Sequence, residues 1–403
     1  MDKTKNLATF FCLYIAQSIP MSFFSTVIPV MMRQEHFSLT QIGLLQLMKL
    51  PWIVKFLWSP LIDRHSVTVN DYKRWIFSSE LFYAVIIFAV AFLQFKTNFP
   101  LILTLVIISF IASATQDIAT DAMAALSFRR EDKSLINSVQ SMGSFGGSLV
   151  GSGILLLLFK QIGWNMILPC VALFVLIAVV PLYFNRSIRI EKSAEKSERA
   201  SIRDILNFFV QKGIGKQIGF LALYYSSMIG TLAMLRPWLV DLGYSMKEIG
   251  QMSGIFGTAT GLIAAFAGGF LIKKIGRGHS RILFAFLIML TTFYFWYMST
   301  NAHPDIQLLY LGIVLLWGSY GMASVAVYTL AMDFVRPGRE GTDFTIQIVI
   351  THLSGIFIST LGGHIADKTN YTTLFLFEFG LACLSFVYIL TVFKRPPGHP
   401  GHK

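Results

Sequence analysis

The stretch NRSIRIEKSAEKSERASIRDILNFFVQKGIG, residues 185–215, interrupts a chain that otherwise consists of long apolar segments. It mixes lysine, arginine, glutamate and aspartate along its length. A helix that crosses a bilayer needs about 20 predominantly apolar residues, and this stretch contains no such run. We therefore expect residues 185–215 to be a cytoplasmic linker between two halves, residues 1–184 and 216–403.

The composition of the chain excludes an ordinary soluble fold. Of the 403 residues, 54% are hydrophobic and only 13% are charged. Soluble globular proteins carry about 25% charged residues. The composition therefore predicts an all-α membrane protein. Leu7–Met32 is too long for the apolar part of a signal peptide and no small-residue cleavage site follows it, so we expect it to form the first membrane helix.

Six apolar segments on each side of the linker have the length of membrane helices. In the first half they are Leu7–Met32, Thr40–Trp58, Trp75–Phe95, Phe99–Leu126, Leu135–Phe159 and Trp164–Phe184. In the second half they are Lys216–Val240, Met246–Ile272, Arg281–Met298, Ile306–Phe334, Asp343–Ile365 and Tyr371–Phe393. The sequence thus predicts twelve transmembrane helices in two six-helix bundles.

Basic residues indicate how these helices are oriented. Cytoplasmic loops of membrane proteins are rich in lysine and arginine. If the N-terminus lies inside, the inner segments carry most basic residues, and the outer loops hold only Arg33, Lys96, Lys160, Lys247 and Lys368. We therefore expect both termini in the cytoplasm. The net charge of +12 is spread over many short loops, so no nucleic-acid partner is expected.

The two halves contain related sequence. SLTQIG at residues 38–43 and SMKEIG at residues 245–250 each open an expected helix with a capping box, in which serine and a glutamine or glutamate satisfy each other's backbone N–H groups. Gln140 and Gln347 are separated by the same number of residues as these two segments. Two parallel six-helix repeats joined by a cytoplasmic linker resemble the major facilitator superfamily.

Four motifs narrow this resemblance. Val54–Arg64 resembles the loop between helices 2 and 3 of AmpG-type permeases, with Ser59 in place of the usual glycine. Thr115–Ala122 resembles the second signature of that branch. Met234–Asp241 and Arg336–Phe344 are similar to segments of the RhtX/FptX siderophore permeases, a twelve-helix subgroup related to AmpG.

The resemblance implies a secondary active transporter rather than an enzyme. It implies a monomeric permease of the bacterial inner membrane that works by alternating access, with proton symport, and that imports a siderophore or its ferric complex. The alternative is an AmpG-type permease for muropeptides or another amide-rich solute. A membrane-embedded enzyme is a third alternative. It is disfavoured because the sequence contains no HExxH, Walker or GxSxG motif.

No cofactor or metal ligand set is expected in the protein. The three cysteines lie inside apolar segments without a CxxC pair or a cysteine–histidine cluster, so neither a disulfide framework nor a zinc site is predicted: Cys12, Cys170 and Cys383. Iron, if it is transported, would travel bound to the siderophore. The expected partners are therefore a small-molecule substrate and the lipid bilayer.

Candidate gate residues lie around helices 2 and 4. In the resembled family, the charges of the helix 2–3 loop latch one state of the transporter, which implies gate roles for Asp63 and Arg64. Asp117 and Asp121 are four residues apart and share one helix face, and such side chains avoid hydrocarbon. Lys55 should lie at a similar depth. We predict an ion pair between Lys55 and one of these aspartates, which either switches during transport or is permanently structural.

The second half departs from this gate motif. Lys273 stands where the motif places aspartate. A matching latch between helices 8 and 9 is therefore not predicted, and lipid anchoring is an equal explanation for the basic residues there. Candidate proton carriers are Asp117, Asp121 and Glu378, because loss of hydration favours a protonated carboxyl group.

Residues for the substrate cavity follow from the resembled architecture, which lines the cavity with helices 1, 4, 7 and 10. On these helices the polar and aromatic candidates are Gln17, Gln116, Tyr224, Tyr225, Arg236, Trp317, Tyr320 and Tyr328. Arg236 could attract an anionic ligand. It could equally pair with Asp241 or extend to the membrane interface.

Overall fold

The computed structural model describes residues 2–34, 48–190 and 200–393, and every regular element within them is a helix. The first half contains α1 Lys3–Gln34, α3 Leu50–Val54, η2 Lys55–Leu57, α4 Ser59–His65, α5 Val69–Val90, α6 Phe99–Ser127, η3 Arg130–Asp132, α7 Lys133–Ser148, η4 Leu149–Ile154, α8 Leu155–Ile162 and α9 Trp164–Phe184. The linker contains α10 Arg203–Phe209, and the second half contains α11 Ile214–Leu223, α12 Ser226–Asp241, α13 Met246–Ile249, η5 Gly250–Gly257, α14 Thr258–Ser299, α15 Ile306–Asp333, α16 Glu340–Lys368 and α17 Tyr371–Val392.

Nine helical runs among the described residues are long and apolar enough to cross a membrane. The expected helix Thr40–Trp58 begins outside the described residues, and α5 carries several charges in its first turns. The expected helices 8 and 9 form one run, interrupted at Gly276, where φ is 81°. These three differences account for the gap between nine runs and twelve expected helices, and the number twelve stays a prediction.

Several expected helix boundaries are wrong in detail. The expected helix Lys216–Val240 is broken into α11 and α12 at Tyr224 and Tyr225. The expected end of the second helix at Trp58 agrees with the structure, in which η2 ends at Leu57. The structure adds a new short helix, α4, which begins at Ser59, because proline in the first turn of a helix loses no hydrogen bond. Part of the expected linker is helical, as α10.

Small residues let α1 and α7 pack closely. Gly143 and Gly147 of α7, and Gly151 of the following η4, are spaced four residues apart and face α1. A Cβ atom on Gly143 would lie 2.5 Å from the Cβ of Tyr14. Such small-residue faces are how membrane helices approach each other without a hydrophobic driving force. This packing brings Tyr14 of α1 and Gln140 of α7 together on Asp121 of α6.

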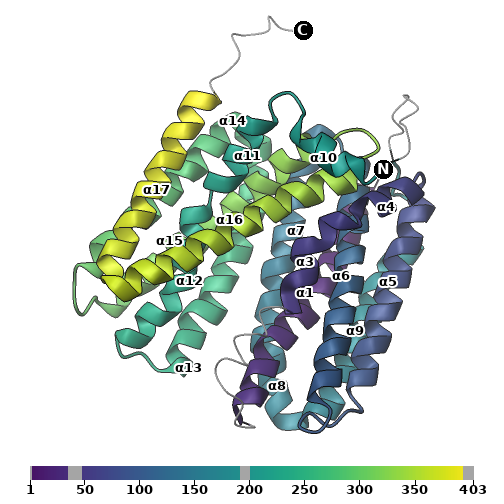
Figure 1. Cartoon of the computed structure of the whole chain (residues 1–403), viewed down its shortest axis with the longest axis horizontal. Coiled ribbons are helices and arrows are strands. Elements are labelled where there is room, and N and C mark those ends of the chain that lie inside the picture. Colours follow the sequence, from purple (N-terminus) through teal and green to yellow (C-terminus); the bar gives the residue numbers. More distant parts are fainter. Residues whose placement is uncertain (1, 35–47, 191–199, 394–403) are drawn as a thin grey trace, which may run out of the picture.

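The two halves lie side by side (Figure 1), with α1–α9 forming one bundle and α11–α17 the other. They are joined by contacts of α14 and α15 with α7, and of α16 with α4 and α6. We use the term gate end for the end of the molecule that holds Asp63, Asp132 and the first turn of α16. The short helix α10 also lies there.

Candidate functional site

Asp63 of α4 binds the start of α16 across the interface between the halves. Its side chain accepts hydrogen bonds from Gly341 N (3.0 Å), Thr342 N (2.7 Å) and Thr342 Oγ1 (2.6 Å). The first N–H groups of a helix have no partner within the helix and carry its positive dipole end. Asp63 therefore satisfies the first turn of α16, whereas its neighbour Arg64 is exposed.

The environment of Asp63 opposes ionisation. Burial raises the pKa of Asp63 to about 7, although the hydrogen bonds from Thr342 act in the opposite direction. A carboxyl group with this pKa changes charge near neutral pH. The contact between α4 and α16 is therefore sensitive to protonation.

A second set of contacts at the gate end joins basic side chains of the second half to acceptors of the first half. Asp132, directly before α7, accepts from Lys3 (2.5 Å) and from Lys273 of the other half (2.8 Å). Arg277 of α14 binds Asp333 of its own half and donates to the carbonyl oxygen of Arg130 across the interface. The second half thus has a latch that the sequence does not predict: cations of α14 meet an anion of the first half.

Backbone and hydroxyl contacts continue the interface along α7. Lys133 Nζ donates to Met332 O (2.7 Å), and Ser138 Oγ donates to Ala265 O (2.7 Å). Farther from the gate end, the hydroxyl oxygens of Ser141 and Ser324 are 3.0 Å apart. The halves are therefore held together from the gate end inward along one face of α7.

A buried polar cluster lies between α1, η2, α6 and α7. Lys55 forms an ion pair with Asp117, which is one of its two predicted partners, and Gln17 Nε2 donates to the same carboxylate (2.8 Å). One turn on, Asp121 accepts from Tyr14 Oη (2.9 Å) and Gln140 Nε2 (2.9 Å). Asp117 and Asp121 thus share one inward face of α6, as their spacing predicts.

The two aspartates of this cluster have different partners, since only Asp117 is paired with a cation. Lys55 and Asp117 are both almost fully buried and neutralise each other. Asp121 has two neutral donors in place of a cation. Tyr14 is absent from the predicted set, and its position three residues before Gln17, on the same face of a helix, is the signal that would have pointed to it.

The predicted cavity residues divide into two groups. Trp317 and Tyr320 pack against Phe145 of α7, with ring centroids 5.5 Å apart for Phe145–Tyr320. Tyr225 packs against Tyr320 at 5.8 Å. Trp317, Tyr320 and Tyr328 are half-buried, whereas Gln17, Gln116, Tyr224 and Tyr225 are buried. Phe145 is absent from the predicted set because phenylalanine is common throughout the chain.

Three further candidates have specific surroundings. Tyr224 Oη donates to Arg281 O (3.0 Å), which places this side chain within the packing of the second half. Arg236 is exposed, and Asp241 accepts from Tyr371 Oη (2.6 Å). Glu378 is fully buried, and neither carboxylate oxygen has a hydrogen-bond partner within the described part of the chain.

Comparison with known proteins identifies the family. A family model described as Major Facilitator Superfamily matches residues 9–359 and, separately, residues 218–403. The chain belongs to the major facilitator superfamily. Both the predicted family and the predicted fold are thereby confirmed, and the protein is a multi-pass membrane transporter.

Relatives within the superfamily agree with the AmpG-like branch. The anhydromuropeptide permease of Escherichia coli strain K12 is 23% identical over 388 residues, which cover 93% of this chain and 77% of the permease. A putative transporter of Rickettsia prowazekii, AmpG 3, is 23% identical over 388 residues and 91% of either chain. A bacterial homologue of the iron transporter ferroportin, solved in an outward-facing state, shares the fold with a TM-score of 0.70 at 16% identity, covering 96% of this chain and 98% of that chain.

Proposed function

We propose that this superfamily member imports an anhydromuropeptide, or a similar amide-rich solute, across the inner membrane by proton-coupled alternating access. The observation that carries the proposal is the alignment with an anhydromuropeptide permease over 93% of the chain. The buried amide side chains Gln17 and Gln140, together with the aromatic group around Phe145, provide the hydrogen-bonding and stacking surfaces that such a solute requires.

One of the two motifs that resemble siderophore permeases, Arg336–Phe344, has another physical role. Within Arg336–Phe344, Arg336 pairs with Asp343, and Gly341 and Thr342 bind Asp63. These residues act at the gate end and carry no information about the ligand. Import of a siderophore or its ferric complex therefore becomes an alternative outcome of the transport assay below.

Alternating access requires the contacts at the gate end to break. In this proposal the gate end faces the cytoplasm, as the distribution of basic residues predicts, so the described arrangement is closed on the inside. Opening it would expose Asp63 and Asp132 to water and separate α7 from α14 and α15. A monomer contains all the parts of this mechanism.

The buried carboxylates are the proposed coupling groups. Asp121 has no cation of its own in the polar cluster, so it is better placed than Asp117 to exchange a proton while the Lys55–Asp117 pair persists. Glu378 is the second candidate, because an ionised carboxylate without partners is strongly unfavourable in the bilayer. The two candidate coupling groups thus lie in different halves, Asp121 on α6 and Glu378 on α17.

Uptake into proteoliposomes tests the proposal. The purified protein is reconstituted and supplied, in parallel, with a labelled anhydromuropeptide and a panel of labelled ferric siderophores, with an acidic exterior. We expect saturable uptake of the muropeptide, loss of proton-driven accumulation in Asp121→Asn, and normal uptake in Arg74→Gln, whose side chain is exposed. Siderophore uptake without muropeptide uptake would overturn the substrate assignment.

A further inference from the structure

The linker helix α10 contacts both halves of the protein. Its Phe208 is fully buried and packs with Ile214 and with Ile346 of α16. Phe56 of η2, in the first half, packs against the same small cluster. The helix is therefore packed in an apolar site at the gate end. A linker that only connected the two bundles would not need such packing.

Asp204 of α10 is bound by two arginines of the loop before α16. Its carboxylate lies 3.1 Å from Arg339 Nε and 3.8 Å from Arg336 Nη1, and its backbone carbonyl accepts from Arg336 Nη2 (2.8 Å). Ser201 N also donates to the carboxylate (2.7 Å). The Asp204 side chain is only 9% exposed, so these contacts are not surface pairs that water readily replaces.

The same arginines fix the geometry of the loop that carries the gate. Arg336 donates to both oxygens of Asp343 (2.6 and 2.8 Å), and Asp343 N donates to Arg339 O (2.8 Å). The loop makes its tight turn at Gly338, where φ is 74°. These contacts enclose residues 336–343, and the two N–H groups that bind Asp63 lie inside that enclosed segment.

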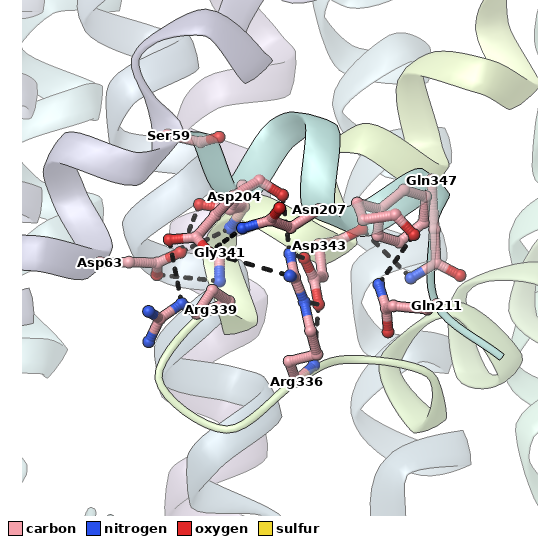
Figure 2. Close-up of polar contacts among 12 residues, drawn as sticks. Ser59, Asp63, Asp204, Asn207, Gln211, Arg336, Arg339, Gly341, Asp343 and Gln347 are labelled. Atoms are coloured by element: carbon pink, nitrogen blue, oxygen red, sulfur yellow. Dashed lines mark hydrogen bonds and ion pairs between the residues drawn. The ribbon is translucent and has the colours of Figure 1, made fainter. Parts of the chain in front are cut away.

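Figure 2 shows Asp204, Arg339 and Asp63 converging on the first turn of α16. We propose that α10 is a working part of the gate and that Asp204 is a positioning residue, which holds Arg336 and Arg339 so that the start of α16 presents its N–H groups to Asp63. Asp204 acts through the two arginines and does not contact Asp63. The inference concerns the gate alone and is independent of the transported solute.

The test measures opening of the gate end rather than transport. The three native cysteines are replaced by serine, and Ser138→Cys is introduced as a reporter, because Ser138 is buried against α14 only while the halves are joined. The rate of alkylation by N-ethylmaleimide then reports how often this end opens. Asp204→Ala should raise the rate about tenfold, the size of a typical coupling between two sites. The matched control Arg203→Ala, an exposed charge on the same helix, should leave it unchanged.

Two further variants separate positioning from loss of structure. Asp204→Glu keeps the charge and should restore most of the slow alkylation. Arg339→Gln should raise the rate as Asp204→Ala does, and the double variant should add little to either, because both changes break one interaction. If Asp204→Ala does not purify as a folded protein, the alkylation rate of Arg339→Gln alone tests the proposal. An alkylation rate equal to that of the parent in every variant, or additive effects in the double variant, would overturn the proposal.

Discussion

The hydroxyl of Thr342 offers the most direct perturbation of the gate. It donates to Asp63 at 2.6 Å, in a buried site at the joined ends of the two halves. Thr342→Val keeps the shape of the side chain and removes this donor. Thr345→Val is a matched control, because Thr345 lies on the same helix, is equally buried, and its hydroxyl has no hydrogen-bond partner among the described residues.

The expected size follows from the charge of the acceptor. Hydrogen bonds to an ionised group contribute about 1.5–3 kcal/mol, whereas neutral ones contribute about 1 kcal/mol. At pH 8 Asp63 is mainly ionised, because its pKa is about 7. A loss of about 2 kcal/mol changes an equilibrium about 30-fold. Thr342→Val should therefore lower the ratio of closed to open gate end about 30-fold at pH 8, and by less at pH 6.

Electron–electron double resonance measures this ratio. Spin labels at His65→Cys and Lys274→Cys, both exposed and on opposite halves, report the separation of the gate ends. Thr342→Val should move population from the short to the long distance, and Thr345→Val should give the distribution of the parent. Equal distributions for the two valine variants at pH 8 would refute the assignment of the Thr342–Asp63 contact as a latch.

Three further perturbations probe other parts of the structure. Because burial raises the pKa of Asp63 to about 7, the closed state binds more protons than the open one, so acidification from pH 8 to pH 6 should favour closure. Asp63→Asn should abolish that pH dependence in the same resonance assay. Lys273→Glu should weaken the second latch by less than about 1 kcal/mol, because the pair with Asp132 is partly exposed. High salt should weaken the Lys273–Asp132 pair in the parent. An opening rate that changes neither with Lys273→Glu nor with salt would count against this second latch. Gly143→Ala should lower the melting temperature by several degrees, because its Cβ would meet α1 at 2.5 Å, whereas Gly153→Ala, with open space around it, should not. Equal melting temperatures would contradict the close packing of α1 and α7.

Length and hydropathy predicted the helices well where one apolar run lies between clear boundaries. Trp164–Phe184 was predicted to the residue, and the start at Phe99 is correct. The break at Tyr224 and Tyr225 was not predicted, because an apolar run reports burial in lipid or protein and does not report where the helix axis changes. The helical spacing of Asp117 and Asp121 placed both on one inward face correctly.

Pairings between distant segments account for most of what the sequence could not show. The Lys55–Asp117 pair was predicted as one of two choices, because both charged residues lie within apolar segments and at a similar depth in the membrane. The Lys273–Asp132 pair was not, because both residues resemble ordinary charges at a membrane surface. Asp204 lies in a polar linker whose composition gives no sign of the two arginines it binds.

Disulfide locking of the halves tests the central claim most directly. Ser141 and Ser324 lie on opposite halves with their hydroxyl oxygens 3.0 Å apart, so Ser141→Cys with Ser324→Cys should form a disulfide in a background without native cysteines. If transport requires the halves to separate along α7, oxidation should abolish substrate uptake and reduction should restore it, while either single variant transports in both conditions. Full uptake by the oxidised double variant would show that this interface does not open during transport.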